Sequence, residues 1–232
     1  NMVLWNNKDF RDYGIIVESI PPIPKAEKNF TKYEVPGRNG YLFVDNGNYK
    51  ITTYSLSCHF HKNADINKIK EFLDGYGTLS IDGKIEYTGV IDGSIPFEKV
   101  MMFRKFLIQF CLNPIGEDIN YTVYKATKND FKITIDNATA IMYPILKISA
   151  TGNVSVTINN QSFNLKDADG EYILDCKNKV ITKNGVNVSY QMQNDFPWLQ
   201  PQENHILYTG SVSSFEIQYK KAYLWGTVWI YI

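Results

Sequence analysis

Two histidines at alternate positions form the clearest grouping of chemically active side chains. His59 and His61 lie in a segment that alternates apolar and polar residues, so a strand there would place both imidazoles on one face. A zinc ion needs about four protein ligands in a structural site and about three in a catalytic one. The third histidine, His205, is distant in the sequence, and no HExxH or CxxC motif supplies further ligands. We therefore expect no metal site and no cofactor, and we treat His59 and His61 as candidate interface residues.

The thiols and carboxylates form no recognisable catalytic arrangement. The chain has an odd number of cysteines, far apart and without a CxxC pair, which is typical of buried thiols in a reducing compartment: Cys58, Cys111 and Cys176. GxSxG, P-loop and GxGxxG motifs are absent. Glycoside hydrolysis needs two carboxylates across a cleft, and the sequence alone pairs none of the candidates Asp92, Glu98, Asp136, Glu171 and Asp175. We expect a protein that is not an enzyme and has no catalytic residues, with a cell-wall hydrolase left open as an alternative.

The tryptophans leave open a further alternative, the binding of carbohydrate by ring stacking. Trp198 follows a proline in an expected loop, and Trp225 and Trp229 lie near the end of the chain. A stacking site needs an exposed aromatic ring beside convergent polar groups, so burial of Trp198 would count against this alternative.

The composition is that of a neutral globular protein. The 232 residues include 24 Lys and Arg and 24 Asp and Glu, and 44% of all residues are hydrophobic. A zero net charge disfavours duplex binding, which usually needs a basic excess, so we expect no direct sequence-specific contact with nucleic acid. No apolar stretch reaches the ~18–20 residues of a membrane helix, and we expect no membrane insertion.

The first half of the chain is predicted to combine strands with one short helix. Residues 51–61 alternate between apolar and polar side chains, and residues 100–112 form a second long predicted strand. Apolar residues at helical spacing predict a helix over 65–75. Asp82 and Gly83 separate two apolar runs, which predicts a β-hairpin with a type I′ turn.

The segment 18–50 is predicted to lie outside the central sheet. Three of its prolines fall within four positions, at Pro21, Pro22 and Pro24, and proline cannot donate a hydrogen bond to a central strand. A glycine-containing turn then separates two extended arms. We expect this segment to protrude or to cross to a neighbouring subunit, and its turn residues are interface candidates: Pro36, Gly37, Arg38, Asn39 and Gly40.

After a turn-rich boundary at residues 113–131, the chain is predicted to be an all-β sandwich. Predicted strands recur at a spacing of roughly 8–12 residues, which is typical of sandwiches. They cover residues 132–137, 144–150, 153–158, 172–176, 179–182, 186–190 and 214–219, and Asn184-Gly185 predicts another primed turn. The predicted fold class is therefore mainly β, with an α+β or β-sandwich domain over residues 1–120, which contains one short helix, and a β-sandwich domain over residues 121–232.

Several short motifs follow one another in a specific order along the chain. They are the Pro36–Gly40 turn, the strand 54–60, the helix end at 72–77, the hairpin 79–87, the strand 106–114, and the motifs at 133–137, 143–148, 172–176, 184–185 and 195–206. This order resembles that of the distal tail proteins of long-tailed, siphovirus-type phages. The chain departs from the family pattern at Ala138-Thr139 and at Gln202, where the family often has glycine.

The resemblance implies a structural virion protein, a baseplate hub component. Such proteins form a hexameric ring at the distal end of the tail and join the tail tube to the tail-tip or fibre proteins. The implied partners are five further copies of the chain, the tail tube protein, and a tail-associated hub or fibre protein. The first domain would form the ring, and the second would be a galectin-like β-sandwich. The implied location is the tip of the phage tail, after synthesis in the bacterial cytoplasm, and a carbohydrate-binding module for host attachment is the alternative function.

Overall fold

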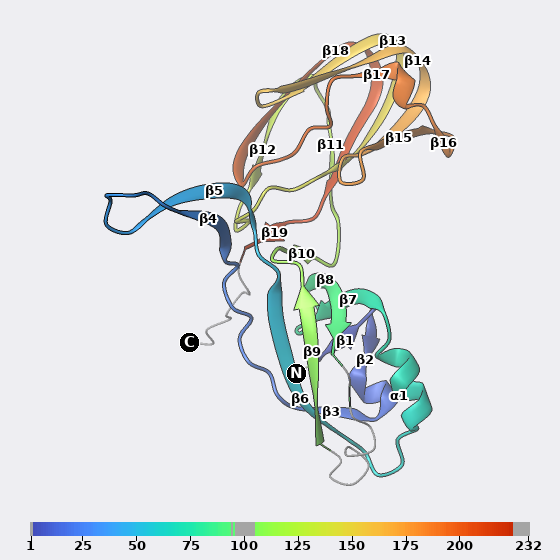
Figure 1. The fold of residues 1–232 in the computed structure, drawn as a ribbon. Helices are drawn as coiled ribbons and strands as arrows, with labels where there is room; N and C mark the ends of the chain where they lie inside the picture. The colour runs from blue at the N-terminus through green and yellow to red at the C-terminus, as the bar shows by residue number, and fades with distance from the viewer. Residues whose placement is uncertain (1, 94, 96–104, 225–232) are drawn as a thin grey trace. The chain divides into compact units, whose positions relative to one another are not determined.

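The chain folds into two compact units, each built on antiparallel β-sheet. The computed structural model describes residues 2–93, 95 and 105–224 (Figure 1). The first unit runs to Glu117 and also includes Leu224, and the second unit runs from Asp118 to Tyr223. The predicted fold class, mainly β with a short helix in the first half, is confirmed.

The first unit contains a large antiparallel sheet, a separate hairpin and a short helix. Its sheet follows the strand order β2-β1-β7-β8-β9-β6-β3, and β4 pairs with β5 in a two-stranded sheet. The elements are β1 (Leu4–Trp5), β2 (Lys8–Asp9), η1, a 3₁₀ turn (Phe10–Tyr13), β3 (Ile15–Ser19), β4 (Lys28–Glu34), β5 (Tyr41–Tyr49), β6 (Thr52–Phe60), α1 (Ile66–Phe72), β7 (Tyr76–Ser80), β8 (Ile85–Asp92) and β9 (Lys105–Leu112).

The core of this unit follows from period-two alternation in β6 and β9. Every second residue of each strand is buried, and the two strands pair so that buried residues face each other, as Tyr54 faces Phe110. The predicted strand 100–112 is observed from Lys105, and its first five residues lie outside the described residues. The predicted strand 51–61 ends at Phe60, one residue before His61.

The helix α1 begins and packs as its sequence predicts. The Asp65 side chain accepts hydrogen bonds from the backbone N–H groups of Asn67 (3.0 Å) and Lys68 (3.3 Å), which is the usual N-cap arrangement. On its buried face, Phe72 contacts Phe10 edge-on at 5.4 Å and stacks with Tyr13 at 3.9 Å between ring centroids. The helix is therefore held against the 3₁₀ turn η1 by aromatic contacts.

The hairpin between β7 and β8 is confirmed, but the predicted type I′ turn is wrong. A type I′ turn needs positive φ at both central residues, and of this pair only Gly83 has it, with φ 71°. A longer loop joins the two strands instead. Within it, the Asp82 carboxylate accepts hydrogen bonds from the N–H groups of Lys84 (2.9 Å) and Ile85 (3.2 Å). By contrast, Asn184-Gly185 joins its two strands directly, with φ values of 50° and 77°, as the sequence predicts.

The second unit is a β-sandwich built largely from three long strands. The sheet order is β11-β18-β13-β14-β15-β16, with β12 on β18 and β17 on β14. The elements are β11 (Thr122–Lys125), β12 (Asp130–Ile135), β13 (Ile145–Ile158), β14 (Gln161–Asp175), β15 (Val180–Lys183), β16 (Val186–Asn187), η2 (Ser189–Gln191), β17 (Met192–Gln193) and β18 (Gln202–Tyr219). Two short strands that flank this segment in the sequence, β10 (Gly116–Asp118) and β19 (Ala222–Tyr223), are not part of this sheet.

The strands β13, β14 and β18 are longer than the sequence predicts. The predicted strands 144–150 and 153–158 are one strand, β13, whose register with β14 shifts between Gly152 and Val154. β14 and β18 likewise extend well beyond the short strands expected there. Bulges explain the difference, because they break the alternation of side chains locally while the strand continues. The predicted strand 186–190 is also wrong, since it ends at Asn187 and gives way to the 3₁₀ turn η2.

The family departure at Gln202 has a visible backbone consequence. Gln202 keeps the left-handed conformation, with φ 73°, that a glycine would adopt without strain. For a residue with a side chain, the left-handed conformation lowers the stability of the folded state by about 1–2 kcal/mol. Glycine avoids this strain, but it lowers stability by about 0.5–1 kcal/mol because it loses more backbone entropy on folding. Gln202 therefore holds this turn at an energetic cost.

We expect Gln202→Gly to raise the free energy of unfolding of the second unit by about 0.5–1 kcal/mol, because it removes this strain. Chemical denaturation followed by hydrogen exchange of β18 would measure the change. The matched control is Gln193→Gly, because Gln193 is also exposed but lies in a strand without positive φ. The control should lower stability, and equal effects of the two substitutions would contradict the explanation.

Candidate interaction sites

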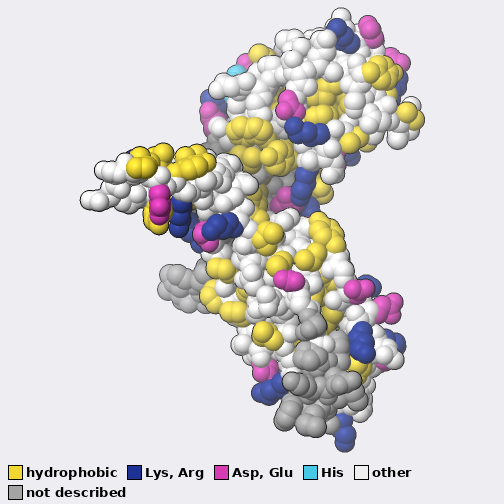
Figure 2. All heavy atoms as spheres, in the orientation of Figure 1, with side chains coloured by type: hydrophobic (Ala, Val, Ile, Leu, Met, Phe, Trp, Pro, Cys, Tyr) yellow, Lys and Arg dark blue, Asp and Glu magenta, His cyan; other side chains and the backbone are white. Residues whose placement is uncertain are grey.

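The hairpin β4–β5 carries the clearest concentration of exposed apolar side chains. Its two strands pair with each other from Lys28 opposite Tyr49 to Glu34 opposite Tyr41, and they join no larger sheet among the described strands. Figure 2 shows hydrophobic side chains along this hairpin. Six large apolar residues of the hairpin are exposed: Phe30, Tyr33, Tyr41, Leu42, Phe43 and Val44. The sequence-based expectation of extended arms outside the central sheet agrees with this arrangement.

The two faces of the hairpin differ in chemistry. Directly opposed residues share a face, so Phe43, which is 57% exposed, shares its face with Lys32, and their ring and ammonium lie 6.0 Å apart. Phe30 and Tyr41 contact the Phe43 ring at 6.5 Å on this aromatic face. The other face carries Leu42 opposite Tyr33 and Val44 opposite Thr31. Both faces thus offer apolar area to a partner.

The five predicted turn residues lie together at the tip of this hairpin. Residues 36–40 connect β4 to β5 and all are exposed. Gly37 and Gly40 have φ values of 79° and 83°, and nothing lies within 4 Å of a side chain built at either position. The glycines therefore serve the turn conformation and are not required by close packing in the isolated chain.

His59 lies in a charged cluster that the sequence analysis missed. Its Nδ1 is 3.1 Å from Glu18 Oε1, and Lys105 Nζ donates to the same oxygen at 3.0 Å. Ser57 donates to the other Glu18 oxygen at 3.2 Å. The ammonium of Lys105, followed by the other donors, holds the pKa of Glu18 below its ordinary value. Glu18 comes from β3, and only the register of β3 on β6 brings it beside His59, so no local sequence signal could have revealed it.

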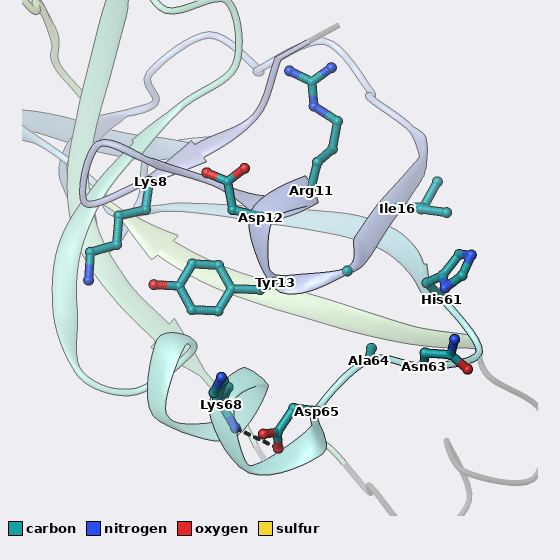
Figure 3. Close-up of a pocket in the computed structure, with 11 residues that line it drawn as sticks. Lys8, Arg11, Asp12, Tyr13, Ile16, His61, Asn63, Ala64, Asp65 and Lys68 are labelled. Atoms are coloured by element: carbon teal, nitrogen blue, oxygen red, sulfur yellow. Dashed lines mark hydrogen bonds between the residues drawn. The ribbon is translucent and has the colours of Figure 1, made fainter.

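His61 has different neighbours from His59 because it follows the end of β6. Its backbone N–H donates to the Gly14 carbonyl at 2.8 Å. Its side chain lines a pocket of about 780 Å³ between η1 and the loop before α1 (Figure 3). The lining is Lys8, Arg11, Asp12, Tyr13, Gly14, Ile16, His61, Asn63, Ala64, Asp65 and Lys68. Basic and acidic groups are mixed there, so the pocket favours neither an anionic nor a cationic ligand.

The three cysteines and one of the carboxylates considered for catalysis, Asp175, occupy structural positions. Burial raises the pKa of the Cys58 thiol to about 12 and also raises that of Cys176, so neither is a thiolate at neutral pH. The pKa of Cys111 is raised mainly because its thiol donates to Asp92 at 3.3 Å. Asp175 accepts hydrogen bonds from the backbone N–H groups of its own turn. Glu98 lies outside the described residues.

Trp198 does not form the exposed stacking platform that a sugar site would require. It is half-buried, and its backbone N–H and carbonyl are both hydrogen-bonded at 3.0 Å to the side chain of Gln161. Trp225 and Trp229 lie outside the described residues. The half-burial of Trp198 counts against carbohydrate binding at this position.

Residues 2–93, 95 and 105–224 contain neither a metal-binding cluster nor a candidate membrane-spanning helix. Within these residues, no three His, Cys, Asp or Glu side chains are grouped so that they could hold a metal ion. In the same part of the chain, no helix has the length and apolar character needed to cross a bilayer.

The chain is similar to known phage tail proteins both in the sequence of its C-terminal half and in its fold. Residues 119–223 match the family described as siphovirus-type tail component, C-terminal domain. The fold is similar to the crystal structure of the SPP1 Dit (gp 19.1) protein, described as a paradigm of the hub adsorption apparatus in phages that infect Gram-positive bacteria. The TM-score is 0.77 at 12% sequence identity, over 96% of this chain and 98% of that one. A comparison with curated protein sequences finds no significant match.

These similarities confirm the resemblance to distal tail proteins that the order of motifs indicated. The C-terminal half carries the sequence signature of a siphovirus-type tail component, and the chain over nearly its whole length has the fold of a distal tail protein. The family consists of structural tail components rather than enzymes.

Proposed function

We propose that this chain, a siphovirus-type tail component by its C-terminal half, is the distal tail subunit of a phage and forms a hexameric ring. The ring would join the tail tube protein to a tail-associated hub or fibre protein at the tip of the virion. The first unit would form the ring and the second would be the galectin-like domain. The single observation that carries the proposal is the fold shared over nearly the full length of both chains with SPP1 Dit, a hub protein.

The hairpin β4–β5 supports self-association. An isolated two-stranded hairpin is at best marginally stable in water, and this one exposes large apolar residues on both faces. Burial of such side chains at a subunit contact would stabilise both the hairpin and the ring. A closed ring needs a head-to-tail contact, in which the hairpin meets a different surface of the next copy.

The predicted interface residues fit this arrangement. The tip residues 36–40 would contact the neighbouring copy together with the apolar residues of the arms. We extend the proposal to His59 and His61, which are partly and largely exposed on the first unit.

We expect the protein to assemble into hexamers and expect the double variant Leu42→Asp, Phe43→Asp to stay monomeric. The two substitutions place one carboxylate on each face of the hairpin, where burial without a partner is strongly unfavourable. Native mass spectrometry and light scattering over a range of protein concentrations would measure the assembly.

The matched control is Val186→Asp, because Val186 is more exposed than either hairpin residue but lies on the second unit. The control should still form hexamers. A wild-type chain that stays monomeric at the highest concentration would overturn the proposed ring, and a double variant that assembles normally would remove the hairpin from the contact.

A further inference from the structure

Three asparagines of the chain directly precede a glycine, and such pairs can undergo a spontaneous covalent change. They are Asn39, Asn46 and Asn184. The side-chain amide of asparagine is thermolabile because the backbone nitrogen of the next residue can attack its carbonyl carbon. A glycine at that next position leaves the nitrogen unobstructed and the backbone free to rotate. The three pairs are alike in sequence, so their surroundings in the structure decide which of them reacts.

The pair at Asn46 is held at both reacting groups. Asn46 Oδ1 accepts a hydrogen bond from the Thr31 hydroxyl at 2.9 Å, across the hairpin. The N–H of Gly47, whose nitrogen would be the nucleophile, donates to Asp45 Oδ1 at 2.9 Å. Asp45 is itself fixed by Lys28, whose ammonium lies 2.7 Å from Oδ2. Ring closure at Asn46 would therefore have to break both hydrogen bonds of the pair.

The pair at Asn184 is held by its turn. Asn184 and Gly185 are the central residues of the primed turn between β15 and β16, with φ values of 50° and 77°. Lys183 pairs with Val186 across the turn. To bring the Gly185 nitrogen to the Asn184 side chain, the backbone must rotate out of the turn conformation, and the paired strands oppose that rotation.

The pair at Asn39 is exposed at the tip of the hairpin β4–β5 (Figure 1). Within the described residues, no hydrogen bond engages the Asn39 side chain or the Gly40 N–H, and the tip has one backbone hydrogen bond, from the Arg38 N–H to the Val35 carbonyl at 3.1 Å. A Cβ built on Gly40 meets nothing within 4 Å, so the space beside its nitrogen is open. Neither reacting group of this pair has to leave a partner before the ring can close.

We infer that Asn39 is a site of spontaneous deamidation in the unassembled chain. The Gly40 nitrogen attacks Asn39 Cγ, and the Cγ–Nδ2 bond breaks. The departing nitrogen takes the N–H proton of Gly40 and leaves as ammonia, which yields a five-membered succinimide. Water then opens one of the two carbonyl–nitrogen bonds of this ring and gives either aspartate or isoaspartate at position 39. No group is oxidised or reduced, and water is the sole co-reactant.

The change would act on the subunit contact, and this part of the inference rests on the proposed ring. Either product adds a negative charge to the tip, and isoaspartate also inserts a methylene group into the backbone of the turn. In the proposed ring, residues 36–40 contact the neighbouring copy, where a carboxylate without a partner is unfavourable to bury. The assembled ring would in turn cover the tip and slow the reaction. Deamidation of Asn39 thus limits the time for which a free chain can assemble.

Peptide mapping by mass spectrometry on the full chain tests the site. The chain is aged as a monomer, at a concentration where light scattering detects no larger species, or as the variant Leu42→Asp, Phe43→Asp if dilution yields no monomer. Trypsin leaves Asn39 and Asn46 in one peptide, residues 39–50, so fragment ions must assign the modified position. We expect Asn39 to convert about tenfold or more faster than Asn46 or Asn184, which is the effect of two hydrogen bonds that need not be broken.

Short peptides that cover each pair are the matched control, because they keep the local sequence and lose the structure. The three pairs should convert at similar rates in these peptides. Similar rates in the folded chain, or faster conversion of Asn46 or Asn184 there, would overturn the assignment of the site to Asn39.

Ageing the chain before assembly tests the consequence. The hexamer fraction should fall in step with modification at position 39, and Asn39→Asp should assemble less from the start. Asn39→Gln keeps an amide but would have to close a larger ring, so it should assemble and lose little with age. Aged chains that assemble as well as fresh ones would overturn the effect on assembly. A chain that never forms a ring would contradict the proposed function, whereas the peptide map would still decide the site.

Discussion

Replacing Phe110 by alanine is expected to lower the free energy of unfolding of the first unit by about 3–5 kcal/mol. The Phe110 side chain is fully buried in β9, between Tyr54 of β6 and Ile91 of β8 in the sheet register. Its ring lies 5.5 Å from that of Trp5, which is also fully buried. Alanine at this position would leave a cavity that strands in a paired sheet can close only in part, so the loss includes both transfer and cavity contributions.

Hydrogen exchange of the β6 and β9 amides, combined with chemical denaturation, would localise the loss to the first unit. Leu107→Ala is the matched control, because Leu107 lies in the same strand but is 57% exposed. The control should change stability by less than about 0.5 kcal/mol. A loss below about 1 kcal/mol in Phe110→Ala would mean that Phe110 is not a central part of the core.

Replacing Asn204 by alanine is expected to destabilise the second unit by about 3 kcal/mol. Asn204 is fully buried, and its amide satisfies polar groups of two other segments. Its Oδ1 accepts from the backbone N–H of Gln200 (2.9 Å) and from Asn159 Nδ2 (3.0 Å). Its Nδ2 donates to the carbonyl of Gln200 at 2.9 Å. Alanine would leave these partly buried groups of Gln200 and Asn159 without this partner, and each unpaired buried group costs about 1–3 kcal/mol.

Denaturation monitored by hydrogen exchange of β12 and β18 would measure this loss. Asn204→Asp should be at least as harmful, because it keeps the shape but replaces the donor with a buried charge. Asn178→Ala is the control, because Asn178 is an exposed asparagine with a single side-chain hydrogen bond, to Asp175. If Asn204→Ala were no worse than Asn178→Ala, the hydrogen bonds of Asn204 would not stabilise this turn.

Asn204 also gives a physical reason for part of the motif that revealed the resemblance. The motif runs from Asp195 to Ile206, and its leucine, Leu199, is fully buried and joins Met142 in a β-bridge. Asn204 closes the turn between Leu199 and β18 through its bonds to Gln200. A sequence pattern can be recognised here because one side chain bonds to both the N–H and the carbonyl of Gln200 in a short loop.

The sequence by itself determined the features that depend on a few neighbouring residues. These include the mainly β composition, the helix α1 with its Asp65 cap, the alternation of buried residues in β6 and β9, and the primed turn at Asn184-Gly185. Each follows from local propensity or from the period of side chains along a strand, and these signals act within one element. The order of such local features was also enough to indicate the family.

Only the tertiary structure decided which side chains from distant segments meet. The pairing of β3 with β6 brings Glu18 to His59, and the folding of β14, β15 and η2 brings Lys183 to Asp169 and Gln191 to Tyr172. Strand register sets these contacts, and a shift by one residue would turn each side chain to the opposite face. Register depends on the packing of the whole unit and on bulges such as that near Gly152, so it is not encoded in any one segment.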